Sequence, residues 1–412
     1  MTLIALTIIN NKTGYLLCHF CLGITGASFV ITQYHTTEMV SNRVVGFAQA
    51  ITAGFGNFGG GCANSVMPLL LYHFDLSWRV YITILSVILI ILAIIYYFGT
   101  DDVFQPDNNN LNVKDNNNIS SPNQSTTNDN DQAILLQHEE SGSISSNNHP
   151  HNSNRKFSSS DIDTITAPTH IRGSFVETIC DYRVWILSLC YGICFGVELT
   201  FYLQAAYWFR LQYDFDEIIS GVLVMIWSSM NLAARPYGGY FSDKYDIQKR
   251  VYVLACILGL EGVFTLIFGL SLLYSQYSYS IIFTVFIMLL FSWTVQMAEG
   301  IVFSIVPFIK SLSPDQDQDD HDHTKGHVMG IVSSGGNLGA TIFIFAIFIP
   351  FTTKYGDGNS DQIDNDSSLW NPWIILGIII MTCSTMPLFI KFKQKEIQIN
   401  NELRQNNDLM YV

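Results

Sequence analysis

Apolar segments of membrane-spanning length fill most of this sequence. Each is close to the roughly 20 residues that an α-helix needs to cross the hydrocarbon core of a bilayer. Nine such segments can be read, at residues 15–34, 44–71, 80–98, 184–209, 218–240, 251–274, 280–309, 328–351 and 370–390. Apolar residues make up 49% of the chain and charged residues only 13%, which excludes an ordinary soluble domain. We therefore expect an all-α, multi-pass membrane protein.

The segment 99–172 differs in composition from the rest of the chain. It is rich in Asn, Ser, Asp and Gln and nearly lacks aromatic residues, so it cannot bury a core and is predicted to be a disordered linker. Three spans and the apolar residues 1–10, which are too short to span, precede it, and six spans follow. Two helical halves joined by a linker are the plan of major facilitator porters, whose halves are parallel repeats around a central site.

This plan sets the expected domain boundaries. Residues 1–98 would be the remainder of an N-terminal half, containing the end of helix 3 and helices 4–6. Residues 173–391 would be a six-helix C-terminal half, helices 7–12, and residues 392–412 a cytoplasmic tail. The first two to three helices of such a fold are missing from the sequence, and we expect an incomplete N-terminus rather than a naturally shorter protein.

The basic residues predict the orientation in the membrane. If the linker is cytoplasmic, fifteen of the 20 Lys and Arg residues lie on the cytoplasmic side and four lie outside, in agreement with the positive-inside rule. We therefore expect the linker and the C-terminus in the cytoplasm, with the plasma membrane as the location. The net charge of −14 comes mostly from loops, so it does not indicate a nucleic-acid partner.

The segment 53–61, Ala-Gly-Phe-Gly-Asn-Phe-Gly-Gly-Gly, places five glycines within one span. Glycine costs about 1 kcal/mol relative to alanine inside a helix, and four-residue spacing, as between Gly56 and Gly60, allows neighbouring backbones to touch. A similar run, Gly-Gly-Asn-Leu-Gly-Ala at 335–340, lies six helices later on the expected count. We interpret both as repeat-related helices that slide during function. The glycines assigned to this role are Gly54, Gly56, Gly59, Gly60, Gly61, Gly335, Gly336 and Gly339.

Arg235 is a charged residue inside an apolar span. Burying an ionised guanidinium there costs from a few to more than about 10 kcal/mol, depending on solvation. One interpretation is that Arg235 extends to the interface, because the polar segment 242–244 is near. The other is that Asn231, Arg235 and Gly239, which share one helix face, present the planar guanidinium to a small planar oxyanion. We favour the second.

Other residues within the spans have two interpretations each. Tyr191 and Phe195 share a helix face and form either ordinary core packing or the walls of a flat anion slot. Three intramembrane acids are either proton carriers or structural partners of Arg235 or of a neighbouring helix. They are Glu198, Glu261 and Glu299. Nothing in the sequence chooses among them.

Signals for metal binding and catalysis are weak. The eight cysteines lie in or beside spans and are interpreted as small apolar residues. The Asp/His-rich segment 315–327 does not match the spacing of a closed zinc site and is interpreted as a solvated loop insertion. No nucleophile–base pair is found, so we expect no metal, no cofactor and no enzymatic activity.

Several blocks together resemble one family, the nitrate/nitrite porters of the major facilitator superfamily, in particular their eukaryotic high-affinity nitrate branch. The segments 53–61 and 330–340 are similar to its two nitrate signatures. Blocks in nearly every other span are similar as well, among them Tyr-Arg-Val-Trp at 182–185, Gly-Val-Glu-Leu-Thr at 196–200 and residues 231–239. This coverage makes the resemblance specific.

The resemblance implies a nitrate slot near the membrane midplane. It assigns Arg235 as one of two substrate arginines, the other belonging to a second helix that the sequence does not contain. It also assigns aromatic and amide residues to the substrate, namely Phe29, Asn57, Tyr191, Phe195 and Asn337. His19 and His35 depart from the residues expected in plant relatives, which leaves the details of helix 4 open.

The resemblance further implies proton-coupled symport of nitrate, or also of nitrite, by alternating access. Exchange of nitrate for nitrite stays open. So do a porter for another small anion and, from a different class, a non-transporting membrane sensor or partner subunit. The expected partners are nitrate or nitrite, protons and the lipid bilayer, and the sequence does not identify an accessory subunit.

Overall fold

The computed structural model describes residues 2–99, 169–275, 281–309, 318–352, 371–398 and 401–402. All regular structure within these ranges is helical, which confirms the expected all-α class. The chain divides into two compact units, one of residues Met1–Ile88 and Ala167–Val412 and the other of Leu89–Thr166. Only the end of one helix is described in the second unit, and most of the predicted linker lies outside the described residues.

One helix before the linker, the second, begins with a side-chain cap. The side chain of Asn11 accepts a hydrogen bond from the backbone N–H of Gly14 at 2.7 Å and so begins the second helix. The elements are α1 (Thr2–Ile8), α2 (Lys12–Gly23), a 3-10 turn (Ile24–Gly26), α3 (Ala27–Met39), α4 (Val45–Pro68), a π-helical turn (Leu69–His73) and α5 (Trp78–Gly99).

The helices after the linker begin at aspartates in two cases. Asp181 accepts from the backbone N–H of Arg183, and Asp216 accepts from that of Ile219. The helices are α7 (Thr169–Cys180), α8 (Tyr182–Tyr213), α9 (Glu217–Ser229), α10 (Ala234–Asp243), α11 (Ile247–Ser275), α12 (Ile281–Ile305), α13 (Gln318–Phe343), α14 (Ile349–Thr352) and α15 (Asn371–Cys383). Short turns lie between or after them, at Met230–Leu232, Val306–Phe308, Ile344–Phe348 and Met386–Phe389.

Eight helical stretches of the described chain are long and apolar enough to cross a membrane. They coincide with eight of the nine predicted spans. The ninth prediction corresponds to α4, which is an unbroken helix whose glycines, glutamine and asparagines lower its mean hydropathy. The segment 315–327 was expected to be a loop, and this was wrong for its second part, because α13 begins at Gln318.

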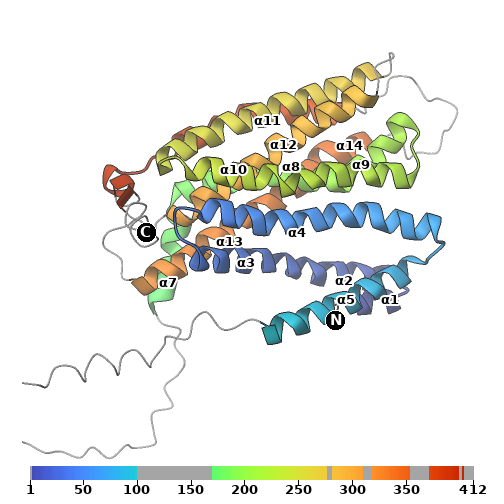
Figure 1. Cartoon of the computed structure of the whole chain (residues 1–412), viewed down its shortest axis with the longest axis horizontal. Helices are drawn as coiled ribbons and strands as arrows, with labels where there is room; N and C mark the ends of the chain where they lie inside the picture. The colour runs from blue at the N-terminus through green and yellow to red at the C-terminus, as the bar shows by residue number, and fades with distance from the viewer. Residues whose placement is uncertain are drawn as a thin grey trace, which may run out of the picture. The chain divides into compact units, whose positions relative to one another are not determined.

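The helices of the larger unit pack around α8. α13 lies along α8, α12 contacts both α8 and α11, and α15 covers α11. α4 runs beside α3 on one side and packs along α9 and α10 on the other (Figure 1). Phe201 and Trp227 stack at 3.9 Å between ring centroids in the core of this unit, with Phe291 against the indole at 4.7 Å.

Glycines allow close backbone approach at two interfaces. On α4, a Cβ added at Gly54 would collide with the carbonyl of Asn231, and one at Gly61 would collide with the Ser228 side chain. On α13, a Cβ added at Gly339 would collide with the backbone of Gly192 in α8. These positions need glycine because a side chain would push the helices apart.

Other glycines of the first run make no such contact with the described residues. A Cβ at Gly56 or Gly59 would meet nothing within 4 Å, and one at Gly60 would meet only the Tyr202 ring at 3.9 Å. The close approach predicted from the spacing of Gly56 and Gly60 is therefore not seen in the described part of the chain. The closely packed face of α4 carries Gly54 and Gly61 instead.

We predict that Gly54→Leu destabilises the protein and that Gly56→Leu, on the same helix, does not. Overpacking of this kind costs about 1–3 kcal/mol or more, and only Gly54 lies against another backbone. Thermal unfolding of the detergent-solubilised protein measures the difference. Equal midpoints for the two variants would contradict the assigned packing face.

Candidate functional site

Arg235 lies just after a break in a membrane-spanning helix. α9 and α10 together form one apolar stretch, but a 3-10 turn interrupts it. Pro236 explains the interruption, because its ring carries no N–H and collides with the carbonyl four residues earlier, that of Leu232. Asn231, in the turn, and Arg235, in the first turn of α10, are both buried.

The guanidinium of Arg235 is 1% exposed and forms an ion pair with Glu299 of α12. Its Nη1 also lies 3.8 Å from Oε2 of Glu198, and its Nη2 donates to the hydroxyl of Tyr191 at 3.3 Å. Its Nε has no hydrogen-bond partner among the described residues. α12 comes this close because a Cβ at Gly300 would collide with the Arg235 carbonyl, so only glycine fits. Arg235 is thus paired inside the protein and does not extend to the interface.

Glu198 of α8 is surrounded by hydrogen-bond donors. Its Oε2 accepts from Nδ2 of Asn57 at 2.9 Å, and its Oε1 accepts from Nδ2 of Asn231 and from the hydroxyl of Tyr202. The Tyr202 hydroxyl lies 3.0 Å from Oγ of Ser228. Both carboxylate oxygens of Glu198 therefore accept hydrogen bonds from other side chains.

Aromatic rings line one side of the guanidinium. The rings of Tyr191 and Phe195 stack at 4.9 Å with an interplanar angle of 5°. Phe303 meets Tyr191 edge-on at 5.0 Å and Phe29 at 5.5 Å. Cζ of Arg235 lies 6.0 Å from the centre of the Phe29 ring, at the limit of a cation–π contact.

The structure therefore brings most of the residues selected from the sequence into one cluster. Arg235, Tyr191, Phe195, Phe29 and Asn57 all belong to it. Glu198 and Glu299 join it as the partners of the arginine.

Two of the selected residues lie elsewhere. Asn337 is on an exposed part of α13, where its backbone carbonyl accepts from Thr341. Its neighbour Gly336 lies beneath the rings of Tyr191 and Phe195 and leaves room for them. Glu261 is buried on α11, and neither of its carboxylate oxygens has a hydrogen-bond partner among the described residues.

Sequence reasoning missed Tyr202, Ser228 and Phe303. A helical signal existed for two of them: Tyr202 follows Glu198 by four residues and Phe303 follows Glu299 by four, so each shares a face with an acid. Ser228 carried no such signal. Its hydroxyl lies 3.0 Å from that of Tyr202 on α8 and donates to the Asn57 carbonyl on α4 at 3.1 Å.

The guanidinium of Arg235 is the group of this cluster with the chemistry to bind a small anion. The guanidinium offers in-plane donors, one of which is unused, next to flat ring faces. Within the described ranges no group of three or more His, Cys, Asp or Glu residues is placed to hold a metal ion.

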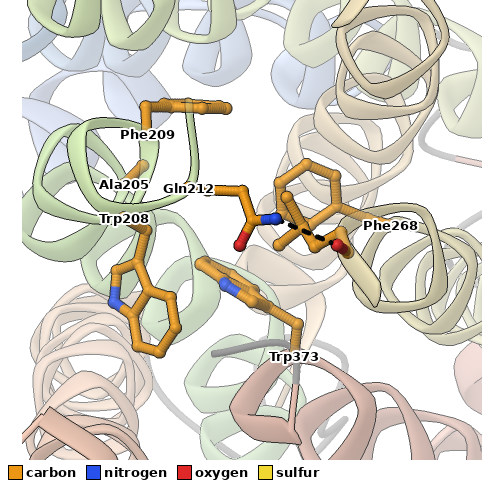
Figure 2. Close-up of a pocket in the computed structure, with 7 residues that line it drawn as sticks. Ala205, Trp208, Phe209, Gln212, Phe268 and Trp373 are labelled. Carbon is orange, nitrogen blue, oxygen red and sulfur yellow. Dashed lines mark hydrogen bonds between the residues drawn. The ribbon is translucent and has the colours of Figure 1, made fainter. Parts of the chain in front are cut away.

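Two cavities lie near the cluster without being part of it. The smaller, about 10 Å³, has room for about one water and lies among Trp208, Phe268 and Trp373, where Gln212 donates to a nearby carbonyl (Figure 2). The larger, about 450 Å³, lies between α4, α8 and α9. An ion pair of Arg210 and Glu217, at 2.8 Å, lines it.

Comparison with known proteins shows the family. Residues 1–344 match the sequence model of the Major Facilitator Superfamily, which is more than half of the chain. The chain belongs to this superfamily. Its members move solutes across membranes, and this membership agrees with the expectation that the protein is not an enzyme.

The relatives within the superfamily are nitrate porters. The chain is 26% identical over 368 residues to high affinity nitrate transporter 2.7 of Arabidopsis thaliana, covering 84% of this chain and 61% of the relative. It is 28% identical over 400 residues to high affinity nitrate transporter 2.5 of the same plant, covering 94% and 63%. A nitrate/nitrite transporter, NrtP, of Picosynechococcus is 25% identical over 181 residues, which is 44% of this chain and 31% of that protein.

These matches confirm the resemblance to the nitrate/nitrite porters of the superfamily. The chain spans about three fifths of the length of the plant relatives it matches. The superfamily assignment rests on the matched residues 1–344, which include α3, α4, α8, α10 and α12 and therefore all of the cluster around Arg235.

We predict that Tyr202→Phe lowers the free energy of unfolding by about 1–3 kcal/mol, because the buried carboxylate of Glu198 loses a donor. Tyr207→Phe, on the same helix, is the matched control, since the Tyr207 side chain lines the larger cavity and is 41% exposed. Denaturant or thermal unfolding in detergent measures both. A loss of the same size in both variants would show that the hydroxyl of Tyr202 has no specific role.

Proposed function

We propose that this chain is a secondary transporter that carries nitrate, with nitrite as a second candidate substrate, across a membrane by alternating access. The observation that carries the proposal is the buried guanidinium of Arg235 beside stacked aromatic rings. The relatives are named as high affinity nitrate transporters and as a nitrate/nitrite transporter, and these names indicate the same substrate class. We propose the plasma membrane as the location, with the linker and the C-terminus in the cytoplasm.

The chemistry of the cluster supports a planar monoanion as substrate. A guanidinium holds its donors in one plane and can bind two oxygens of such an anion side by side. Nε of Arg235 is the unused donor, and the Tyr191 hydroxyl lies next to Nη2. Ring faces such as those of Tyr191 and Phe195 exclude water, which strengthens these hydrogen bonds.

Helices from both expected halves contribute to the cluster. Phe29 comes from α3 and Asn57 from α4, before the linker, whereas Glu198, Arg235 and Glu299 come from helices after it. A site shared by two halves is accessible from either side in turn when the halves rock against each other. This placement supports alternating access around the Arg235 cluster.

The two ends of the interface between the halves differ. At the end that we assign to the cytoplasm, Asp243 accepts from the backbone N–H of Phe47 at 2.8 Å, and Lys325 pairs with Glu38 at 3.1 Å. At the other end, the larger cavity opens between α4, α8 and α9, with Arg210 in its lining. We propose this cavity, whose lining holds the ion pair of Arg210 and Glu217, as the outer approach to the cluster.

Proton coupling is part of the proposal. Two of the three candidate acids, Glu198 and Glu299, pair with Arg235, so a change in their charge acts directly on the residue that binds the anion. Glu261 is buried outside the contacts of the guanidinium.

The substitution Arg235→Lys tests the assignment of the site. An ammonium group cannot reproduce the fork of a guanidinium, and losing a charge-assisted hydrogen bond of about 1.5–3 kcal/mol reduces nitrate uptake about tenfold to a hundredfold. Uptake of labelled nitrate into proteoliposomes is the measurement. Arg79→Lys is the control, because Arg79 is exposed and its guanidinium contacts only Asn10, Ile9 and the Trp78 ring among the contacts described.

Wild-type uptake by Arg235→Lys would contradict the site. Uptake of chloride or formate in place of nitrate by the wild-type protein would favour a porter for another small anion. Nitrate binding without any flux would favour the sensor alternative.

A further inference from the structure

The charges around Arg235 do not suit an anion in their present state. One guanidinium lies between two carboxylates, Glu198 and Glu299, all three buried. A monoanion that joined this cluster would bring a third negative charge next to a single positive one, in surroundings where water cannot screen the repulsion. Either the anion is rejected or one carboxylate loses its charge.

The two carboxylates are held very differently. Glu198 accepts hydrogen bonds from three side chains, those of Asn57, Asn231 and Tyr202. Glu299 accepts a hydrogen bond from one side chain, through Nη1 of Arg235 on its Oε2, and its carboxyl group lies next to that of Glu198. Its Oε1 is buried and has no hydrogen-bond partner among the described residues. A proton on Glu198 would compete with hydrogen bonds that its oxygens already accept, whereas a proton on Oε1 of Glu299 would displace no hydrogen-bond donor.

We propose that Glu299 and the transported anion compete for the same N–H groups of Arg235, and that Glu299 takes up a proton when the anion binds. This inference rests on the proposed function and assigns the proton step to one of its candidate acids. The anion takes the place of the Glu299 carboxylate on the guanidinium, and the displaced carboxyl group remains in the cluster as a neutral acid.

The step balances in charge and atoms. A hydronium ion on the side of uptake gives a proton to an oxygen of Glu299: one O–H bond of the hydronium ion breaks, which leaves water, and one O–H bond forms on the carboxyl group. The cluster gains the negative charge of the anion and loses that of Glu299, so its net charge is unchanged. One proton therefore accompanies each anion through this site.

The titratable and charged groups that face Glu299 come from three packed helices. Arg235 on α10 pairs with Glu299 through its Nη1, and Glu198 on α8 lies 3.8 Å from the same nitrogen. The other titratable groups that interact electrostatically with Glu299 are Tyr191, Cys194 and Tyr202 on α8 and Glu261 on α11. Of these groups, only Arg235 is a cation. The ionised form of Glu299 is therefore stabilised only while its carboxylate is paired with Arg235.

The test measures nitrate affinity and proton uptake together. For the purified wild-type chain in detergent, we expect the affinity for nitrate to fall as the pH rises. In the pH range where Glu299 is ionised in the free protein, the dissociation constant increases about tenfold per pH unit. In weakly buffered solution with a pH-sensitive dye, binding removes about one proton from solution per nitrate. The sign follows from linkage: a group that gains a proton on binding makes binding tighter at low pH.

The variant Glu299→Gln imitates the protonated acid. It is expected to bind nitrate with an affinity that no longer changes with pH and without proton uptake. In proteoliposomes it retains exchange of labelled nitrate but loses accumulation driven by a pH gradient. The matched control is Glu261→Gln, which removes another buried carboxyl group but no partner of Arg235, and which retains both the pH dependence and the proton uptake.

The outcomes separate the inference from the function. The role of Glu299 would be overturned if nitrate binding by Glu299→Gln still changed with pH, or if Glu261→Gln lost proton uptake instead. Either result would leave nitrate transport itself uncontradicted. If Glu299→Gln does not fold, the absence of proton uptake by the wild type overturns the inference by itself. No nitrate binding or exchange by the wild type at any pH would overturn the proposed function and this inference together.

Discussion

The placement of one ionised guanidinium among membrane-spanning helices constrains this structure more than any other interaction. An arginine in hydrocarbon must be paired, because an unpaired charge there costs several kcal/mol or more. Arg235 meets this condition through Glu299, Glu198 and the Tyr191 hydroxyl, all drawn from other helices. The packing of α8, α10 and α12 is thus tied to the electrostatics of a single side chain.

Glycine and proline make that pairing geometrically possible. Pro236 interrupts its own helix just before the arginine, and Gly300 lets the backbone of α12 come against the Arg235 carbonyl. Gly54 does the same for α4 against Asn231, which brings Asn57 within reach of Glu198. Residues without side chains therefore determine which polar side chains meet. A membrane protein can use this device because lipid provides little hydrophobic drive between helices.

The sequence predicted the fold class and the central residue but not the pairing. Helix length and composition identified nine spans, eight of which coincide with described helices apolar enough to cross a membrane, and the cost of burial singled out Arg235. Which of the three acids lie beside Arg235 depends on contacts between residues of different helices that are 37 or more positions apart in the sequence, such as Arg235 and Glu198. Helical periodicity describes one helix at a time and gives no information on such contacts. Periodicity likewise placed Gly56 and Gly60 on one face of α4 without showing that the neighbouring helices pack on the face of Gly54 and Gly61.

The two glycine-rich helices show how far the internal repeat extends. Both α4 and α13 use glycine to approach a neighbour, and both continue into a π-helical turn, so the backbone role is repeated. The asparagines are not equivalent: Asn57 donates to Glu198, whereas Asn337 lies on an exposed part of its helix. Among the described residues, close glycine contacts are therefore common to α4 and α13, whereas the hydrogen bond to Glu198 belongs to the asparagine of α4.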